Sequence, residues 1–406
     1  MPAHDLSACP RRRGRSPFPA LAAVAATVAL TAATASPAAA EAREPAPASR
    51  AEIQRALDAM VAAGAPGVTA RITDENGTWT ATSGVADLDS GTPMPANGAF
   101  RPASVTKSLV ATVVLQLEDE DALSLDDTLG ELLPGTVPGG DGVTVNRLLN
   151  HTSGLPDYIE DPLFEDPEDY TRRGFTPEEL VEIADRQDPS AEPGEFAYSN
   201  TNYVLLGMIV EELTGNTLGD ELGDRVLRPA GMDRSYLPVR ETGLPGEHAS
   251  GYYRLAGRQD LTEATEIDPS FAWAAYGLVS TPEDVAGFYR ALWDGDLLPA
   301  ASLAKMREMV PGPNFFMSGY GLGLERMDLT CTSPEGHTGS IPGFSTFAFL
   351  TGDGDRQVTV SANAFLLDAS ATPMILAALD VLNLGLCGEP FTPPQAMEQA
   401  GPLAPA

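Results

Sequence analysis

A serine and a lysine stand three residues apart at the start of an apolar stretch, in Ser104-Val105-Thr106-Lys107. Positions i and i+3 share a helix face, so the Lys107 amine would lie beside the Ser104 hydroxyl at a helix N-terminus. A partly desolvated lysine can lose its proton near neutral pH and then accept the hydroxyl proton, which turns the serine into a nucleophile. The alternative is that Ser104 only caps the helix and Lys107 is solvated. Only Lys107 and Lys305 are lysines in this chain, so a motif that needs a lysine is more informative here.

A tyrosine and an asparagine two residues apart, Tyr198 and Asn200, precede a second apolar stretch at residues 203–210. A phenol that faces a lysine can ionise or pass a proton to a leaving group, and an amide can fix a substrate carbonyl. The alternative for Tyr198 is a packing aromatic without a chemical role.

A third group, His337-Thr338-Gly339-Ser340, precedes a predicted core strand. Hydrogen-bonding side chains and a glycine along a strand edge can hold an extended peptide that ends in a carboxylate. The backbone N–H groups of Ser340 and Ser104 would together form an oxyanion hole. The alternative for His337 is a hydrogen-bonded histidine in a turn.

The two ends of the chain predict a sheet and the helices beside it. Ser49 and Glu52 form a capping box for a helix that stops near Gly64, and residues 68–74 and 78–83 form a hairpin. Near the other end, strand patterns at 344–350 and 357–363 precede a helix at 374–384. Between them, further helices are predicted from 104, 176, 201 and 281.

This order predicts an α+β fold in which an antiparallel sheet is flanked by N- and C-terminal helices and a mostly helical domain is inserted. We expect the sheet domain to comprise residues 49–103 and 275–388, and the helical domain residues 104–274. A cleft at their junction is the expected ligand site.

Both ends of the chain are predicted to lie outside the folded domains. A basic start, an apolar run at 21–34 and Ala38-Ala39-Ala40 predict a secretory signal over residues 1–40, cleaved near Ala40. The alternative is a single membrane anchor. Residues 41–48 read as a Pro/Ala linker, and residues 389–406 as a Pro- and Ala-rich disordered or processed tail.

Cysteine and charge composition narrow the function further. Export would leave Cys331 and Cys387 in an oxidising compartment, where we expect a disulfide; the alternative is two unpaired buried thiols. A net charge of −32 argues against nucleic acid as a partner. The sequence contains no H-E-x-x-H or Cys-x-x-Cys spacing, so we predict no metal and no cofactor.

Together and in this order, the motifs S-x-x-K, Y-x-N and H-T-G resemble the penicillin-recognising active-site serine family. The sequence is most similar to secreted D-alanyl-D-alanine carboxypeptidases of actinomycete type and is related to class C β-lactamases. Supporting stretches are residues 148–155, 198–203 and 320–324, and the resemblance covers residues 50–388.

The resemblance implies a β-lactamase/transpeptidase-like fold and a role for each motif residue. Ser104 would be the acylated nucleophile, with Lys107 and Tyr198 as the acid/base pair. Asn200 would orient the acyl amide. His337 would supply hydrogen bonding and a positive field, and Thr338 and Ser340 would contact the substrate carboxylate. Gly339 would allow close backbone approach. Phe164 and Trp273 would form aromatic walls of the site. We expect His151 to brace a loop.

One position departs from the family pattern. Glu325 stands where an arginine that grips the substrate carboxylate is expected, and Arg326 follows it. Either Arg326 substitutes through a local shift, or carboxylate recognition is weaker.

Together with the predicted secretory signal, the resemblance implies a secreted, monomeric serine D-alanyl-D-alanine carboxypeptidase. Either water or an acceptor amine would resolve its acyl-enzyme, and the second route would be transpeptidation. The enzyme would act on peptidoglycan stem peptides that end in D-Ala-D-Ala, and β-lactams would acylate Ser104. The alternatives are a class C-like β-lactamase or carboxylic esterase with the same machinery, or a catalytically silent penicillin-binding sensor.

Overall fold

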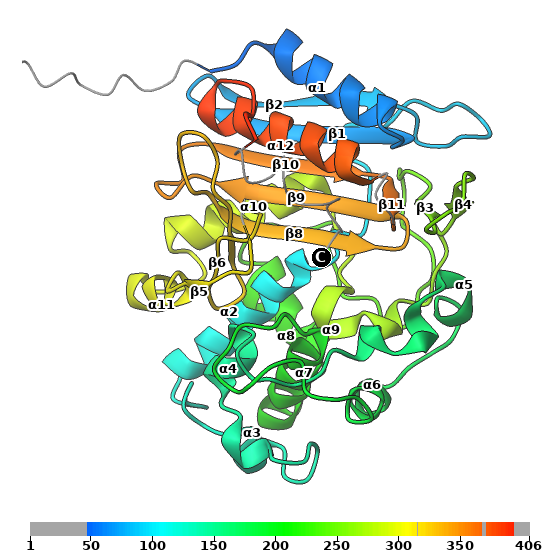
Figure 1. Cartoon of the computed structure of the whole chain (residues 1–406). Helices are drawn as coiled ribbons and strands as arrows, with labels where there is room; N and C mark the ends of the chain where they lie inside the picture. The colour runs from blue at the N-terminus through cyan, green and yellow to red at the C-terminus, as the bar shows by residue number, and fades with distance from the viewer. Residues whose placement is uncertain (1–46, 315, 368–370, 394–406) are drawn as a thin grey trace, which may run out of the picture. The chain divides into compact units, whose positions relative to one another are not determined.

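An eight-stranded antiparallel sheet built from both ends of the chain organises the fold (Figure 1). Its strand order is β2-β1-β10-β9-β8-β7-β6-β5. The strands are β1 (Gly67–Asp74), β2 (Gly77–Gly84), β5 (Val310–Pro311), β6 (Gly319–Tyr320), β7 (Glu325–Arg326), β8 (Glu335–Ile341), β9 (Phe344–Leu350) and β10 (Gln357–Ala362). The predicted hairpins of both chain ends are confirmed, and β1 of the first pairs with β10 of the second.

Twelve α-helices lie within the described residues. They are α1 (Arg50–Ala62), α2 (Val105–Asp119), α3 (Leu129–Leu132), α4 (Val145–Leu149), α5 (Pro167–Tyr170), α6 (Pro177–Ala184), α7 (Asn200–Thr214), α8 (Leu218–Leu222), α9 (Trp273–Tyr276), α10 (Pro282–Asp294), α11 (Ala300–Met306) and α12 (Ala371–Cys387). Short 3₁₀ turns occur at Gly140–Gly142, Tyr158–Glu160, Pro162–Phe164 and Pro269–Phe271, and a π-helical turn at Gly223–Leu227. The capping box of α1 at Ser49 and Glu52 is present as predicted.

Helices cover both faces of the sheet. α1 and α12 pack side by side on one face, where Val358 and Val360 of β10 join their apolar core. α10 packs on the opposite face, where Gln357 of β10 donates a hydrogen bond to the Ala286 carbonyl. Gln357 and Val358 face opposite sides of the sheet because successive side chains of a strand alternate between its two faces.

The remaining helices form a second layer around α2 and α7. Most residues of these two helices are buried, 12 of 15 in α2 and 10 of 15 in α7, in agreement with their largely apolar sequences. α2 contacts β8 of the sheet as well as α7 and α9, so it links the sheet to the helical part. The sheet takes no strand from the residues between β2 and β5, in agreement with a predicted helical insertion.

A small second sheet was not predicted from the sequence. It has the order β11-β3-β4, with β3 (Tyr252–Arg254), β4 (Thr262–Glu263) and β11 (Ala364–Leu366). β3 and β11 pair in parallel although they lie far apart in the chain. Strands of two or three residues leave too little periodic pattern to be recognised.

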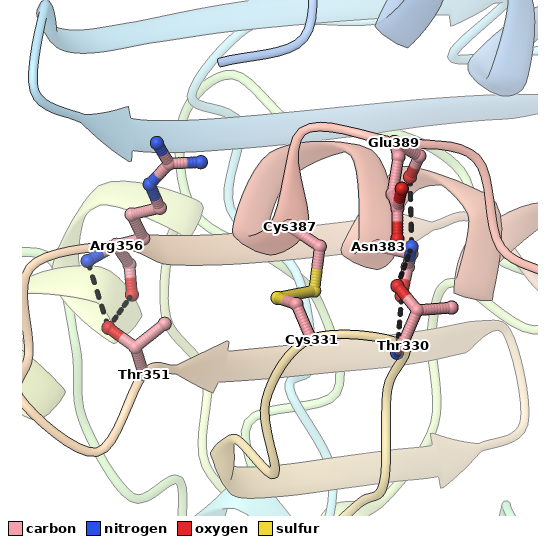
Figure 2. Close-up of a disulfide and its surroundings, with 7 residues drawn as sticks. All are labelled: Thr330, Cys331, Thr351, Arg356, Asn383, Cys387 and Glu389. Carbon is pink, nitrogen blue, oxygen red and sulfur yellow. Dashed lines mark hydrogen bonds between the residues drawn. A yellow bond between two sulfur atoms is a disulfide. The ribbon is translucent and has the colours of Figure 1, made fainter. Parts of the chain in front are cut away.

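The predicted disulfide joins Cys331 to Cys387, with the Cα atoms 5.6 Å apart (Figure 2). It fixes the loop between β7 and β8 to the end of α12. Beside it, the Asn383 side chain donates hydrogen bonds to Thr330 and to the Glu389 carbonyl. The bridge therefore holds the chain segment that precedes the His337 strand.

The first residues of the predicted disordered tail are ordered, which corrects that expectation for residues 389–391. Phe391 packs against the core beneath α12, and its N–H donates to Asp380. An aromatic side chain supplied enough apolar area to hold this segment, which its Pro-rich composition did not indicate.

The computed structural model describes residues 47–314, 316–367 and 371–393, which belong to one unit that begins at Pro45. The predicted signal, most of the linker and residues 394–406 lie outside the described residues. Within the described part, none of the helices combines the length and apolarity needed to cross a bilayer.

Candidate active site

Ser104 stands immediately before α2, where the first backbone N–H groups of a helix lack intrahelical acceptors. Its side chain makes no capping hydrogen bond, so the simple helix-cap role is wrong. The preceding residue, Ala103, has φ 51°, a conformation that L-residues rarely adopt. This strained turn presents a half-buried Ser104 side chain at the start of the helix.

Gly339 of β8 allows the sheet to approach this turn closely. A β-carbon on Gly339 would lie 2.2 Å from the Pro102 carbonyl oxygen and 3.1 Å from the Ser104 nitrogen. Only a residue without a side chain fits between the strand and the serine. The glycine is thus required for contact between β8 and the Ser104 turn, whereas the predicted approach of a substrate backbone stays a prediction.

Lys107 lies fully buried, one helical turn after Ser104. Its Nζ donates hydrogen bonds to Ser104 Oγ at 3.1 Å, to Asn200 Oδ1 at 2.7 Å and to the Ala275 carbonyl at 3.0 Å. Burial lowers the pKa of Lys107 to about 7, against the opposing charges of Asp157 and Glu325. A solvated lysine is thus excluded, and a neutral amine beside the serine is available near pH 7.

Three tyrosine rings surround the Lys107 amine. Nζ lies 4.8 Å from the ring centroid of Tyr198, 5.5 Å from that of Tyr203 and 5.6 Å from that of Tyr276. Ring faces attract a cation, so this cage favours the protonated amine while burial favours the neutral one. The balance lets Lys107 both accept and return a proton.

Asp157 is a site residue that the sequence analysis did not identify. Asn200 bridges it to the lysine, because the Asn200 Oδ1 accepts from Lys107 while its Nδ2 donates to Asp157 Oδ2 at 2.9 Å. Burial raises the pKa of Asp157 to about 6, although hydrogen bonds from Asn200 and Ile159 oppose this. Its only local signal was a capping position ahead of a short turn, which is common in loops.

Tyr198 lies in the loop before α7, and the nearby Ser104 side chain acts to lower the pKa of its phenol. Burial holds the pKa of Tyr198 well above its ordinary value, and the charge of Glu325 adds to this effect. The phenol is therefore protonated at neutral pH and is suited to donate a proton.

His151 braces the Tyr198 loop, as we expected. Its Nδ1 accepts hydrogen bonds from the Ser199 N–H and from Asn202 Nδ2, and its ring centroid lies 4.2 Å from that of Tyr198. Burial and nearby positive charge hold the pKa of His151 well below its usual range. The histidine is therefore a neutral support for the tyrosine.

His337 of β8 is fully buried and neutral, which corrects the expected positive field. Burial, with a smaller effect from Lys107, lowers the pKa of His337 to about 3. Its Nδ1–H donates to the Thr338 carbonyl at 2.5 Å, and its Nε2 accepts from the Tyr320 hydroxyl at 2.9 Å. The expected hydrogen bonding is present, and it orients the strand.

Thr338 and Ser340 lie half-buried on β8, at the edge that faces away from β9. β7 pairs with β8 only as far as Gly336, so it leaves this edge uncovered. The Thr338 N–H points away from β9, toward Glu325, and the alternation of an antiparallel strand turns the Ser340 N–H the same way.

Glu325 fills the position where an arginine was expected, and it lies behind Thr338. Its Oε2 accepts from the Thr338 N–H at 2.9 Å, and its Oε1 accepts from the Thr338 hydroxyl at 2.8 Å. His337 Nδ1 lies 3.1 Å from Oε1. Burial raises the pKa of Glu325 to about 7, while the hydrogen bonds from Thr338 and the charge of Lys107 lower it.

Arg326 is not brought to the serine. Adjacent strand residues point to opposite faces, and Arg326 lines a separate depression with Met309, Ser318 and Asp328. It therefore does not take the place of the missing arginine.

The two predicted aromatic walls differ in position. Phe164 is buried in a cluster with Tyr158, Tyr170 and Phe175, where it supports the fold of the helical part. Trp273 is half-buried and packs close to Gly207 of α7, two residues before the Ala275 carbonyl that accepts from Lys107. Trp273 is therefore close in the chain to a hydrogen-bond partner of Lys107, whereas Phe164 packs within an aromatic cluster.

Among the described residues, no cluster of three or more His, Cys, Asp or Glu side chains could hold a metal ion. The groups gathered around Ser104 are instead a buried amine, a protonated phenol and an amide. Such a set can transfer protons to and from a serine hydroxyl and a leaving group.

Residues 53–383 match the family described as Beta-lactamase. The chain belongs to the beta-lactamase family. Its fold is accordingly the β-lactamase/transpeptidase-like α+β fold, and the family is one of penicillin-binding-protein-like serine hydrolases.

Three similar proteins illustrate the range of the family. Penicillin-binding protein 4 from Amycolatopsis lactamdurans is 31% identical over 304 residues, covering 67% of this chain and 74% of the relative. D-aminopeptidase from Brucella anthropi is 28% identical over 321 residues, covering 75% of this chain and 56% of the relative. A D-stereospecific amidohydrolase from Streptomyces sp. has a similar structure, with a TM-score of 0.77, 34% identity, and coverage of 84% of this chain and 99% of that protein.

The matched region covers only part of several relatives. It spans 56% of the length of the D-aminopeptidase and 62% of the length of PbpX from Bacillus subtilis (strain 168). The activities of those whole proteins therefore enter only as support for a proposal.

Proposed function

We propose that this chain is a serine amidohydrolase that cleaves the amide bond following a D-amino acid residue through a Ser104 acyl-enzyme. The observation that carries the proposal is the hydrogen bond between the buried Lys107 amine and Ser104 Oγ, at 3.1 Å, with the lysine pKa lowered to about 7. A serine needs such a base to act as a nucleophile. The D-stereospecific amidohydrolase and the D-aminopeptidase among the similar proteins support the D-configured substrate class.

In the acylation step, Ser104 Oγ forms a bond to the substrate carbonyl carbon while its proton moves to Lys107 Nζ. The backbone N–H groups of Ser104 and Ser340 stabilise the negative oxygen that develops. Tyr198 then donates its phenolic proton to the leaving nitrogen as the carbon–nitrogen bond breaks, and Lys107 returns a proton to Tyr198. The products are an amine and a Ser104 ester.

Water resolves the ester. Its oxygen bonds to the ester carbonyl carbon, its proton passes to Lys107, and the bond to Ser104 Oγ breaks as Oγ regains a proton. The enzyme is restored and a carboxylic acid is released. Asn200 holds Lys107 during both steps, because its Oδ1 accepts from Nζ at 2.7 Å.

A D-alanyl-D-alanine carboxypeptidase is the second candidate, with peptidoglycan stem peptides as substrates. The open edge of β8 at Thr338 and Ser340 favours it, since that edge suits an extended peptide. The similarity to penicillin-binding protein 4 also supports it. Both candidate functions form the same acyl-enzyme. They differ in the leaving amine, which carries a free carboxylate for the carboxypeptidase and lacks one for the amidohydrolase.

We also propose export of the chain by its first 40 residues, and action as a monomer outside the cell. The support is the basic start followed by a short apolar run and an Ala-rich cleavage site. The N-terminal sequence of protein collected from culture medium is expected to begin at Glu41; a secreted protein that retains residues 1–40 would contradict cleavage there.

The experiment that tests the function combines labelling and turnover. Purified protein is incubated with benzylpenicillin and analysed by intact-protein and peptide mass spectrometry, while hydrolysis of the amides of D- and L-phenylalanine is followed in parallel. We expect an adduct on Ser104 and hydrolysis of the D-amide, both abolished in Ser104→Ala. An intact Ser104 with no turnover of any D-amide or D-Ala-D-Ala peptide would overturn the proposal.

A further inference from the structure

The carboxylate of Glu325 accepts both hydrogen-bond donors of Thr338 on β8. β8 presents Thr338 and Ser340 along its open edge, next to the Ser104 turn. Glu325 is 1% exposed and lies directly behind Thr338. It accepts both the backbone N–H and the hydroxyl proton of Thr338, at 2.9 and 2.8 Å.

Because its proton is committed to Glu325, the Thr338 hydroxyl offers lone pairs to a ligand at the open edge of β8. A substrate carboxylate at this point would meet those lone pairs and, behind them, the buried negative charge of Glu325. Like charges at short range disfavour each other strongly where water is excluded. An N–H donor would instead complete the hydrogen bonding of the threonine.

The three neighbouring basic side chains, His337, Arg326 and Lys107, do not direct a donor to a ligand at Thr338. His337 is neutral and spends its Nδ1–H on the Thr338 carbonyl, and Arg326 points to another face of β7. Lys107 is committed to Ser104, Asn200 and the Ala275 carbonyl. The polarity of this subsite is therefore set by Glu325.

We propose that Glu325 is a positioning residue that acts through Thr338 to select substrates whose leaving group carries a carboxamide in place of a free carboxylate. This inference rests on the proposed function and names its substrate class: D-aminoacyl peptides with an amidated end. The selection is made in the acylation step, because the leaving group departs before water enters.

The test uses two peptides with the same acyl part, diacetyl-Lys-D-Ala-D-Ala and its C-terminal carboxamide. At pH 8, above the Glu325 pKa of about 7, the wild-type enzyme is expected to show kcat/KM at least about tenfold higher for the carboxamide. In Glu325→Gln we expect this ratio to fall at least about fivefold, through faster turnover of the carboxylate peptide. A purely structural role for Glu325 would slow both peptides equally and leave the ratio unchanged.

Glu335→Gln is the matched control. Glu335 is a second buried carboxylate of the same sheet, but it pairs with Arg307 and not with Thr338. Its replacement is expected to leave the ratio unchanged. The binding of the two peptides can also be compared without following turnover, from how strongly each one slows the acylation of Ser104 by benzylpenicillin.

The outcomes separate the two proposals. Equal use of both peptides by the wild type, or a ratio that does not change in Glu325→Gln, overturns the selection by Glu325 and leaves the acyl-enzyme intact. A failure of benzylpenicillin to modify Ser104, together with no turnover of either peptide or any D-amide, overturns the proposed function itself.

Discussion

Two buried carboxylates flank Lys107, and they act on opposite sides of the site. Asp157 belongs to the helical side and reaches the lysine through Asn200, whereas Glu325 belongs to the sheet and hydrogen bonds to Thr338. Burial raises the pKa of both, to about 6 and about 7. The Asp157 carboxylate, bonded to Asn200, therefore affects the pKa of the base, whereas the Glu325 carboxylate, bonded to Thr338, defines a ligand subsite.

The comparison also explains why the lysine pKa lies near neutrality. Burial alone lowers it, and the charges of Asp157 and Glu325, in that order, raise it again. The helical side thus contributes more to the basicity of Lys107, and the sheet side contributes more to recognition. Each variant below changes one side or the contact between them.

Removal of the shared lysine has the largest expected effect. Lys107→Ala should reduce the rate of Ser104 acylation by benzylpenicillin by about 10³-fold, because no other group accepts the serine proton. Lys305→Ala, which removes an exposed lysine paired with Glu118, should leave the rate unchanged. Stopped-flow labelling measures both rates, and a loss below tenfold in Lys107→Ala would show that the lysine is not the base.

Moving β8 away from the Ser104 turn should have the next largest effect. A β-carbon in Gly339→Ala would collide with the Pro102 carbonyl, which forces β8 away from the Ser104 turn. We expect acylation to slow by about 10²-fold, because the oxyanion donors are displaced. Gly287→Ala is the control, since a β-carbon there meets only the Ala230 carbonyl oxygen, at 3.7 Å. Equal rates in the two variants would contradict the close approach.

The pH profile separates the two carboxylates. Acylation requires neutral Lys107, so the rate should rise with pH through about 7. Asp157→Asn removes a charge that favours the protonated amine, so the lysine pKa falls and the acid limb moves to lower pH. Glu325→Gln should move the limb the same way by less. The kcat/KM profile of a D-amide measures this, and a limb that moves to higher pH in Asp157→Asn would contradict the assigned electrostatics.

The disulfide should have the smallest effect on the chemistry. Replacing Cys331 and Cys387 together by serine opens a loop with a sequence separation of 56, which is expected to cost about 4 kcal/mol of unfolding free energy. Acylation should change by less than about twofold, because the bridge lies away from Ser104. Urea unfolding and penicillin labelling test the two parts; an unchanged midpoint would contradict the first, and slower labelling the second.

Features that depend on residues close together in the chain could be predicted from the sequence. The capping box at Ser49 and Glu52 and the strand patterns on either side of the tight turn at Glu75 and Asn76 specify their elements within a few residues. The serine–lysine pair was recognisable for the same reason, since helix geometry fixes their spacing. These features depend on neighbours in the chain, so a single sequence reveals them.

The remaining features depend on contacts between distant residues. Asp157 and Asn200 are 43 residues apart, and only the fold shows that they share a hydrogen bond. The neutral state of His337 follows from complete burial, which its motif did not indicate. The isolation of Arg326 from the site follows from strand alternation at β7, and the position of Glu325 from the pairing of β7 with β8.

The most direct test of the account is the titration of Lys107 itself. The chain contains two lysines, so selective ¹³C-lysine labelling gives two side-chain signals, with Lys107→Ala to assign them. We predict that the Lys107 signal titrates at about pH 7, while hydrogen bonding to Glu118 holds the pKa of Lys305 above its ordinary value. Two signals that both titrate above pH 10 would contradict the central claim that a neutral lysine activates Ser104.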